Sequence, residues 1–208
     1  MSYNPQIHHR RSIRLKGYDY SQAGAYYFTI VVQYRACLFG NVLSGEIILN
    51  DAGKMVWEQW NTLPERFPNI ELDEFIVMPN HVHGILVITE RRGDGLSSPS
   101  DMGQAHAGQA QGVAPTNQVP RGADTKHDPK LGNILGAWKS IVTDEYIKGV
   151  RQKNWEPFDK KLFQRNYYEH IIRNERELDA VRAYIINNPA NWENDQENSR
   201  GVGRRGNS

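Results

Sequence analysis

The sequence predicts an α+β protein in which helices pack on the faces of an antiparallel sheet. Short runs of aromatic and β-branched residues indicate strands, and longer segments carry apolar residues at helical spacing. These segments follow one another in the order strand, helix, strand, strand, helix, strand, helix. That alternation favours a sheet whose helices cover its faces.

The first half of the chain supplies three strands and one helix. Residues 26–33 are aromatic and β-branched, which predicts a buried strand. Residues 50–63 carry apolar side chains at helical spacing, begin at a capping Asn50 or Asp51, and end at a proline. Residues 72–78 and 81–88 are apolar runs separated by Pro79-Asn80, which predicts a hairpin.

The second half supplies two helices and one extended segment. Helical spacing of apolar residues returns over residues 131–150, and residues 163–172 have strand character. Asn174 is the expected N-cap of the last helix, with Glu177 as its capping-box partner. Pro189 is the expected end of that helix.

A chain of 208 residues is long enough for one domain with an insertion. The sequence predicts a basic N-terminal segment at residues 1–25, a single catalytic domain at 26–192 and a flexible tail at 193–208. Residues 91–128 are rich in Gly, Ser, Gln, Ala and Pro, so we expect a disordered insertion within the domain.

Composition limits the class of protein. The formal net charge is only +1, which argues against a protein that coats nucleic acid without specificity. Cys37 is the single cysteine, which fits a reducing cytoplasm, and no apolar run is long enough for a membrane span. Basic residues near the N-terminus are candidate phosphate contacts or solubilising charges: Arg10, Arg11, Arg14 and Lys16.

His81 and His83 are the candidate metal ligands. Side chains alternate between the two faces of a strand, so these two histidines point the same way and both rings can reach one cation. Apolar residues on both faces further along predict that this strand is central in the sheet. A purely structural role for the pair remains open from this pattern alone.

Tyr184 is the candidate nucleophile. On a helix of 100° per residue it falls within one arc with Leu178, Val181, Ile185 and Asn188, and that arc is expected to face the body of the protein. The alternative is a core aromatic with a helix-end asparagine. A phenol beside a cation fits attack on a phosphodiester, since the cation lowers the cost of forming the phenolate.

Several motifs together resemble the REP-associated tyrosine transposases, single-tyrosine members of the HUH endonuclease superfamily. The matching stretches are RRSIRLKGYDYSQAGAYYFTI, CLFG, FIVMPNHVHGILVI, FQRNYYEHIIRNERELDAVRAYIINNP and the following Asn191-Trp192. The resemblance covers residues 10–192 apart from the insertion.

The resemblance implies a ferredoxin-like catalytic domain, in which His81, His83 and Asn188 hold a divalent metal ion, Mg²⁺ or Mn²⁺, and Tyr184 attacks the DNA. His170 matches a motif histidine that supports the site or the DNA. The implied reaction is cleavage of single-stranded DNA with REP-type hairpins, which leaves a 5′-phosphotyrosine link and a free 3′-OH. We expect a cytoplasmic, nucleoid-associated monomer or homodimer.

Three other hypotheses can be weighed against the sequence. A catalytically idle protein that binds DNA hairpins would keep the fold without the chemistry. An RNA-binding ferredoxin-like module would expose aromatic residues on the sheet. A structural zinc site is disfavoured because Cys37 is isolated.

Overall fold

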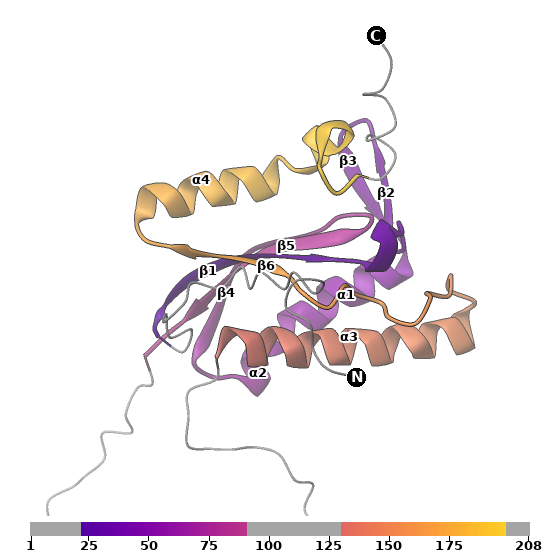
Figure 1. The fold of residues 1–208 in the computed structure, drawn as a ribbon, viewed down its shortest axis with the longest axis horizontal. Coiled ribbons are helices and arrows are strands. Elements are labelled where there is room, and N and C mark those ends of the chain that lie inside the picture. The colour runs from indigo at the N-terminus through magenta and orange to yellow at the C-terminus, as the bar shows by residue number, and fades with distance from the viewer. Residues whose placement is uncertain (1–21, 91–129, 199–208) are drawn as a thin grey trace, which may run out of the picture. The chain divides into compact units, whose positions relative to one another are not determined.

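A computed structural model describes residues 22–90 and 130–198, which form a four-stranded antiparallel sheet with helices on both faces (Figure 1). The strand order is β4-β5-β1-β6, and every neighbouring pair is antiparallel. The strands are β1 Gly24–Val31, β4 Ile70–Val77, β5 His81–Ile88 and β6 Tyr168–Ile172.

The topology confirms the expected ferredoxin-like fold. The crossover from β1 to β4 contains helix α1, Asp51–Asn61, and the crossover from β5 to β6 contains α3, Leu131–Lys153. This is the βαββαβ pattern of ferredoxin-like folds. β5 lies between β4 and β1, so the strand that carries His81 and His83 is central, as predicted.

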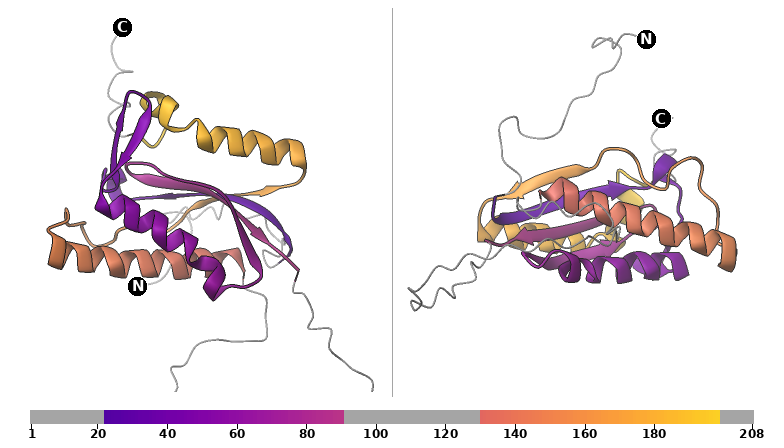
Figure 2. Two further views of the ribbon diagram at one scale, coloured as in Figure 1. Left: turned by 180° about the vertical axis from the view of Figure 1, so that it is seen from behind. Right: turned by 90° about the horizontal axis from the view of Figure 1, so that it is seen from below.

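The helices divide between the two faces of the sheet. Helix α1 packs beside α3 on one face, while α4, Glu175–Ile186, covers the other (Figures 1 and 2). A single-turn helix α2, Leu63–Arg66, follows α1. Asn50 is the N-cap of α1, where its Oδ1 accepts a hydrogen bond of 2.9 Å from the amide of Gly53.

Strand alternation divides the core into two layers. Val82, Leu86 and Ile88 of β5 belong to the larger core beneath α1 and α3, whereas Ile85 belongs to a smaller core beneath α4. A side chain at Gly84 would collide with the ring of Phe28, since its Cβ would lie 2.6 Å from the Phe28 Cζ. Because side chains alternate along a strand, His81 and His83 lie on the same face as Ile85, which is the face covered by α4.

Some elements were not predicted. A β2–β3 hairpin, Gly40–Leu43 and Glu46–Leu49, stands apart from the main sheet, and a 3₁₀ helix, Pro189–Asn194, follows α4 (Figure 1). The hairpin strands are four residues each and partly exposed, so their apolar pattern is too short to stand out. Their turn uses positive φ at Ser44 and Gly45, 52° and 80°.

Two boundaries differ from the expectation. Helix α4 ends at Ile186, and Pro189 begins the 3₁₀ helix instead of ending α4. Residues 193–198 are folded instead of belonging to a flexible tail, because the Glu197 carbonyl accepts a hydrogen bond of 2.7 Å from the Asn80 amide. The basic residues at 10–16 and the insertion at 91–128 lie outside the described residues.

The insertion is predicted to be dispensable for folding. Replacing residues 91–128 with a short Gly/Ser loop should change the free energy of unfolding by less than about 1 kcal/mol, since loop-closure entropy depends weakly on length. Chemical denaturation of both proteins measures this difference. A much larger loss of stability would show that the insertion contributes structure to the folded domain.

The part of the chain that the structure describes contains no helix long and apolar enough to cross a membrane.

Candidate active site

His81 and His83 form the centre of the site. Both are buried, at 0% and 3% exposure, and their Nε2 atoms lie 2.9 Å apart. Burial on a central strand lets the sheet hold both rings in place. Two imidazole nitrogens converging at this distance form a pair of donors for a divalent cation.

Asn80 sets the orientation of the His81 ring. The Asn80 amide nitrogen donates to the carbonyl oxygens of Arg35 and Glu197, at 3.1 and 2.7 Å, so its Oδ1 must face His81. Because an amide oxygen only accepts, the His81 Nδ1 at 2.8 Å carries the proton. The Nε2 lone pair of neutral His81 is therefore directed into the site.

Two hydroxyl groups of β1 contact the Nδ1 side of the His83 ring. The Tyr27 hydroxyl lies 2.8 Å and the Thr29 Oγ1 2.9 Å from the His83 Nδ1. A hydroxyl can donate or accept, so either tautomer of His83 is satisfied here. When these groups accept from Nδ1, the Nε2 of His83 is available as a ligand, as in other histidine metal sites.

These hydroxyls give a testable effect on metal affinity. The double variant Tyr27→Phe/Thr29→Val keeps the side-chain volumes but leaves His83 Nδ1 without its two hydroxyl partners. We expect Mn²⁺ affinity to fall by about 10- to 100-fold, the usual effect of losing such supporting groups. Isothermal titration measures the change. Thr143→Val is the matched control, because that hydroxyl donates to the Lys139 carbonyl on α3; equal affinity in the double variant and the control would contradict the prediction.

Burial lowers the pKa of His81 to about 3, and burial together with His81 lowers that of His83 to about 3. Both rings are therefore neutral near pH 7, the form that binds metal.

Among the described residues, Asp195 joins them in a group whose ligand atoms lie within 4.8 Å of one another. Its Oδ2 is 3.8 Å from the His81 Nε2.

The lowered pKa values predict how stability depends on pH. Unfolded histidines titrate near 6.5, so the unfolded chain binds protons first as the pH falls. The stability that comes from neutral His81 and His83 is present above pH 6.5 and is lost between about 6.5 and 3. With a chelator present, the free energy of unfolding should fall between pH 7.5 and 5, and less steeply in His81→Ala/His83→Ala. Identical slopes in the two proteins would contradict this account.

Asn188 lies beside His83, where the resemblance expects a third ligand. It follows the end of α4, is 2% exposed, and its Nδ2 is 3.2 Å from the His83 Nε2. Its Oδ1 is buried and has no hydrogen-bond partner within the described structure. A buried carbonyl oxygen without a partner is costly, and a metal ion would satisfy it after a flip of the amide. The residues present therefore fit a divalent metal ion.

Asp195 is a site residue that the sequence did not reveal. It follows the 3₁₀ helix and lies 112 positions from His83, so no spacing rule links the two residues. Its side chain is only 6% exposed. The one available signal is the position of its carboxylate shortly after the Asn191-Trp192 motif. A carboxylate also improves the match to Mg²⁺, which prefers oxygen ligands.

Tyr184 borders the site from α4. Its ring centroid is 5.4 Å from that of His83 and 6.2 Å from that of Tyr27. The side chain is 51% exposed, unlike Ile185, which is 1% exposed and supports the helix. The predicted inward arc is thus correct for Ile185 and Asn188, whereas Tyr184 lies at its edge, where a substrate can reach it. Burial and the Asp195 carboxylate raise the pKa of Tyr184, so its resting form is the neutral phenol.

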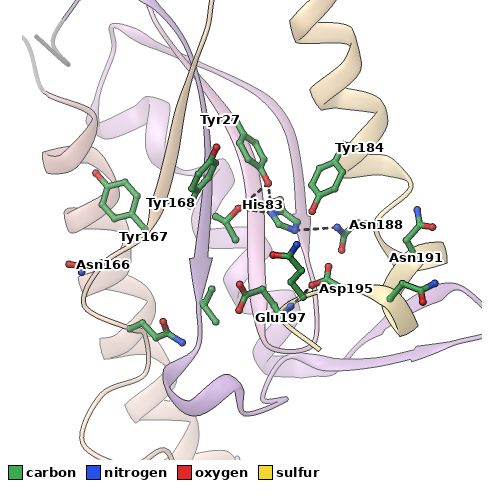
Figure 3. Close-up of a pocket in the computed structure, with 15 residues that line it drawn as sticks. Tyr27, His83, Asn166, Tyr167, Tyr168, Tyr184, Asn188, Asn191, Asp195 and Glu197 are labelled. Atoms are coloured by element: carbon green, nitrogen blue, oxygen red, sulfur yellow. Dashed lines mark hydrogen bonds between the residues drawn. The ribbon is translucent and has the colours of Figure 1, made fainter. Parts of the chain in front are cut away.

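His83 lines a pocket of about 670 Å³. Tyr184 and Asn188 lie on one side, and Asn166, Tyr167 and Tyr168, at the start of β6 and just before it, lie on the other, with His83 between them (Figure 3). The Tyr184 ring lies 5.4 Å from that of His83, centroid to centroid.

His170 lies outside this pocket. It is on β6, cross-strand from Tyr27, and its Nε2 is 2.6 Å from the Glu177 Oε1. The other carboxylate oxygen of Glu177 accepts a hydrogen bond from the Arg173 amide. In a capping box it would accept from the amide of the N-cap residue, Asn174. Asn174 is the N-cap as predicted, since its Oδ1 accepts from the Glu177 amide. His170 therefore ties the start of α4 to the sheet.

By fold and site, the chain is a ferredoxin-like α+β protein with a buried two-histidine centre that could hold a metal ion. It is 40% identical over 194 residues to an uncharacterized protein of Haemophilus influenzae, covering 93% of this chain and 96% of that protein. The chain belongs to the same family as that protein. No protein-family model matches the sequence.

Two solved structures are similar to the chain. One is a REP-associated tyrosine transposase bound to a REP hairpin, 17% identical, with a TM-score of 0.49 over 92% of this chain and 86% of that one. The other is a candidate transposase from Deinococcus radiodurans, 14% identical, with a TM-score of 0.40 over 84% of this chain and 95% of that one. Both TM-scores are below 0.5, so neither similarity by itself establishes a common fold.

Proposed function

We propose that the chain is a REP-associated tyrosine transposase: a metal-dependent endonuclease and strand transferase for single-stranded DNA with REP-type hairpins. One observation carries the proposal. Tyr184 lies in one pocket with the buried His83, whose ring centroid is 5.4 Å away and whose Nε2 converges with that of buried His81 at 2.9 Å. The combined motifs around His81, His83 and Tyr184 support the same family.

The proposed ligands are His81, His83 and Asn188, with Asp195 as a further oxygen donor. A bound Mg²⁺ or Mn²⁺ ion would neutralise phosphoryl oxygens and favour the phenolate. Burial and the Asp195 carboxylate raise the pKa of Tyr184, so a neighbouring cation is the natural way to make this phenol reactive at neutral pH. Tyr27 is less suited to attack, because it is buried and its pKa is raised by burial.

In the proposed reaction, the Tyr184 oxygen forms a bond to phosphorus while the bond from phosphorus to the 3′-oxygen breaks. The phenol proton is lost and the 3′-oxygen gains a proton, so the products are a 5′-phosphotyrosine link and a free 3′-OH. Attack of another 3′-OH on this link would transfer the strand and regenerate Tyr184. The reaction needs only positioning and charge neutralisation, with no oxidant or reductant. We propose that it takes place in the cytoplasm, on nucleoid DNA.

The deciding experiment is incubation with labelled single-stranded DNA from the flanks of the gene, with and without Mn²⁺. The proposal expects a covalent protein–DNA adduct only when Mn²⁺ is present. A protein that binds the hairpin tightly but forms no adduct with any divalent metal would be a hairpin-binding regulator, the competing function. The buried histidine pair favours the enzyme, since hairpin binding alone requires no such centre.

A further inference from the structure

A second recess lies behind the segment that forms one wall of the active-site pocket. It has a volume of about 410 Å³ and lies between α3 and residues 158–165. Four cationic side chains and one carboxylate, Asp144, are among its lining groups. The cations are Lys139 of α3 and Lys160, Lys161 and Arg165 of the segment between α3 and β6.

Lys139 is held in this recess instead of extending into solvent. Its Nζ donates to the Gln164 carbonyl at 2.7 Å and lies 5.8 Å from the centroid of the Phe163 ring. Burial and the neighbouring Lys161 lower the pKa of Lys139 to about 8. Among the described residues, no carboxylate forms an ion pair with any of the four cations. An anion in the recess would relieve their mutual repulsion.

The two cavities meet at Gln164, which lines both of them. The backbone amide of Gln164 donates to the Val31 carbonyl at 2.8 Å, so this residue is fixed to the end of β1. Beyond Gln164, the segment continues with Asn166, Tyr167 and Tyr168 along the active-site pocket (Figure 3). A polymer bound in the active-site pocket could therefore pass over Gln164 and contact the four cationic side chains.

If the substrate is a polyanion, the active-site pocket needs cationic side chains nearby. Its described lining residues include the carboxylates Asp195 and Glu197 but no lysine or arginine. Tyr168, which is 45% exposed, offers a ring on which a base can stack. A metal ion would attract the phosphate at which cleavage occurs, yet the adjoining phosphates of the strand would still need cations.

We infer that the recess formed by Lys139, Lys160, Lys161 and Arg165 binds backbone phosphates of the single strand whose scissile phosphate lies beside Tyr184. This inference rests on the proposed function for its substrate. The bound group is a phosphodiester, held by ammonium and guanidinium groups without reading the bases. Gln164 and its neighbours form the ridge between the cleavage pocket and this phosphate subsite.

The test uses the double variant Lys160→Asn/Lys161→Gln. Lys160 has a positive φ of 60°, a conformation that Asn tolerates, so the turn should be preserved. The charge-matched control is Lys54→Gln/Lys148→Gln, because both of these lysines pair with a carboxylate within their own helix. Thermal unfolding verifies that both double variants fold.

Fluorescence anisotropy is measured with fluorescein-labelled single-stranded DNA at several salt concentrations. A short oligonucleotide fills the active-site pocket, and longer ones extend on either side. We expect wild type and control to bind one of the longer strands more tightly than the short oligonucleotide. In the double variant, this gain in affinity should be smaller by roughly tenfold. Loss of two phosphate contacts should also reduce the salt slope by about 1.4, taking about 0.7 per phosphate.

A second readout follows Lys139 directly. In wild-type protein, NMR of the lysine Nζ groups should show the pKa of Lys139 rising above about 8 when the longer strand binds. An unchanged Lys139 pKa, or equal affinity of the double variant and the control, would overturn the phosphate subsite while leaving the Mn²⁺-dependent adduct intact. Loss of affinity in the double variant without any adduct in wild type would support the subsite and overturn the proposed cleavage. If wild type binds no single-stranded DNA, both proposals fail.

Discussion

Tyr184→Phe should abolish the covalent protein–DNA adduct, with a loss of cleavage of at least about 10³-fold, while DNA binding changes little. The substitution removes only the nucleophilic oxygen. The ring keeps its contacts with Tyr27 and His83, whose centroids lie 6.2 and 5.4 Å away. Because half of the side chain is exposed, the free energy of unfolding should change by less than about 1 kcal/mol.

The measurement combines denaturing gel analysis of the adduct with anisotropy of the bound hairpin. Tyr168→Phe is the matched control, since that tyrosine lines the same pocket from the opposite side (Figure 3). The control should keep the adduct. If Tyr184→Phe still forms the adduct and Tyr168→Phe does not, the nucleophile is Tyr168; if neither variant is affected, Tyr167 is the next candidate.

His81→Ala and His83→Ala should each suppress cleavage by about 10³-fold or more, because each removes one of two converging nitrogen ligands. Mn²⁺ binding should fall below detection in both variants. A histidine pair binds Mg²⁺ weakly, so Asn188, Asp195 and the DNA phosphate are needed to complete the oxygen ligands. Metal affinity of the wild-type protein should therefore rise when single-stranded DNA is bound, and Mn²⁺ should support activity at least as well as Mg²⁺.

Val82→Ala is the control for this pair. Val82 lies between the two histidines in sequence but belongs to the core on the other face of the sheet. Its truncation should lower the free energy of unfolding by about 2 kcal/mol and leave Mn²⁺ affinity unchanged. Calorimetric titration of Mn²⁺ into the three variants and wild type, with and without DNA, makes the comparison. Wild-type Mn²⁺ binding and cleavage in both histidine variants would refute the metal site.

Local sequence patterns predicted the main helices and strands and several of the site residues. Period-two alternation predicted that His81 and His83 share a face, and helical periodicity predicted that Ile185 and Asn188 face the body of the protein, as both do although α4 ends at Ile186. The N-caps Asn50 and Asn174 were readable because capping depends on residues only three positions apart. Each of these features depends on interactions within one element, which a short stretch of sequence contains.

Tertiary structure alone decided the groups that meet across elements. Asp195 reaches His81 from the end of the 3₁₀ helix, and Tyr27 and Thr29 reach His83 from β1 through the antiparallel register Thr29↔His83. The cations of the inferred phosphate subsite come together only where α3 packs against the segment before β6. Such contacts depend on strand order, register and packing, which follow from burial of the whole core and not from any local pattern.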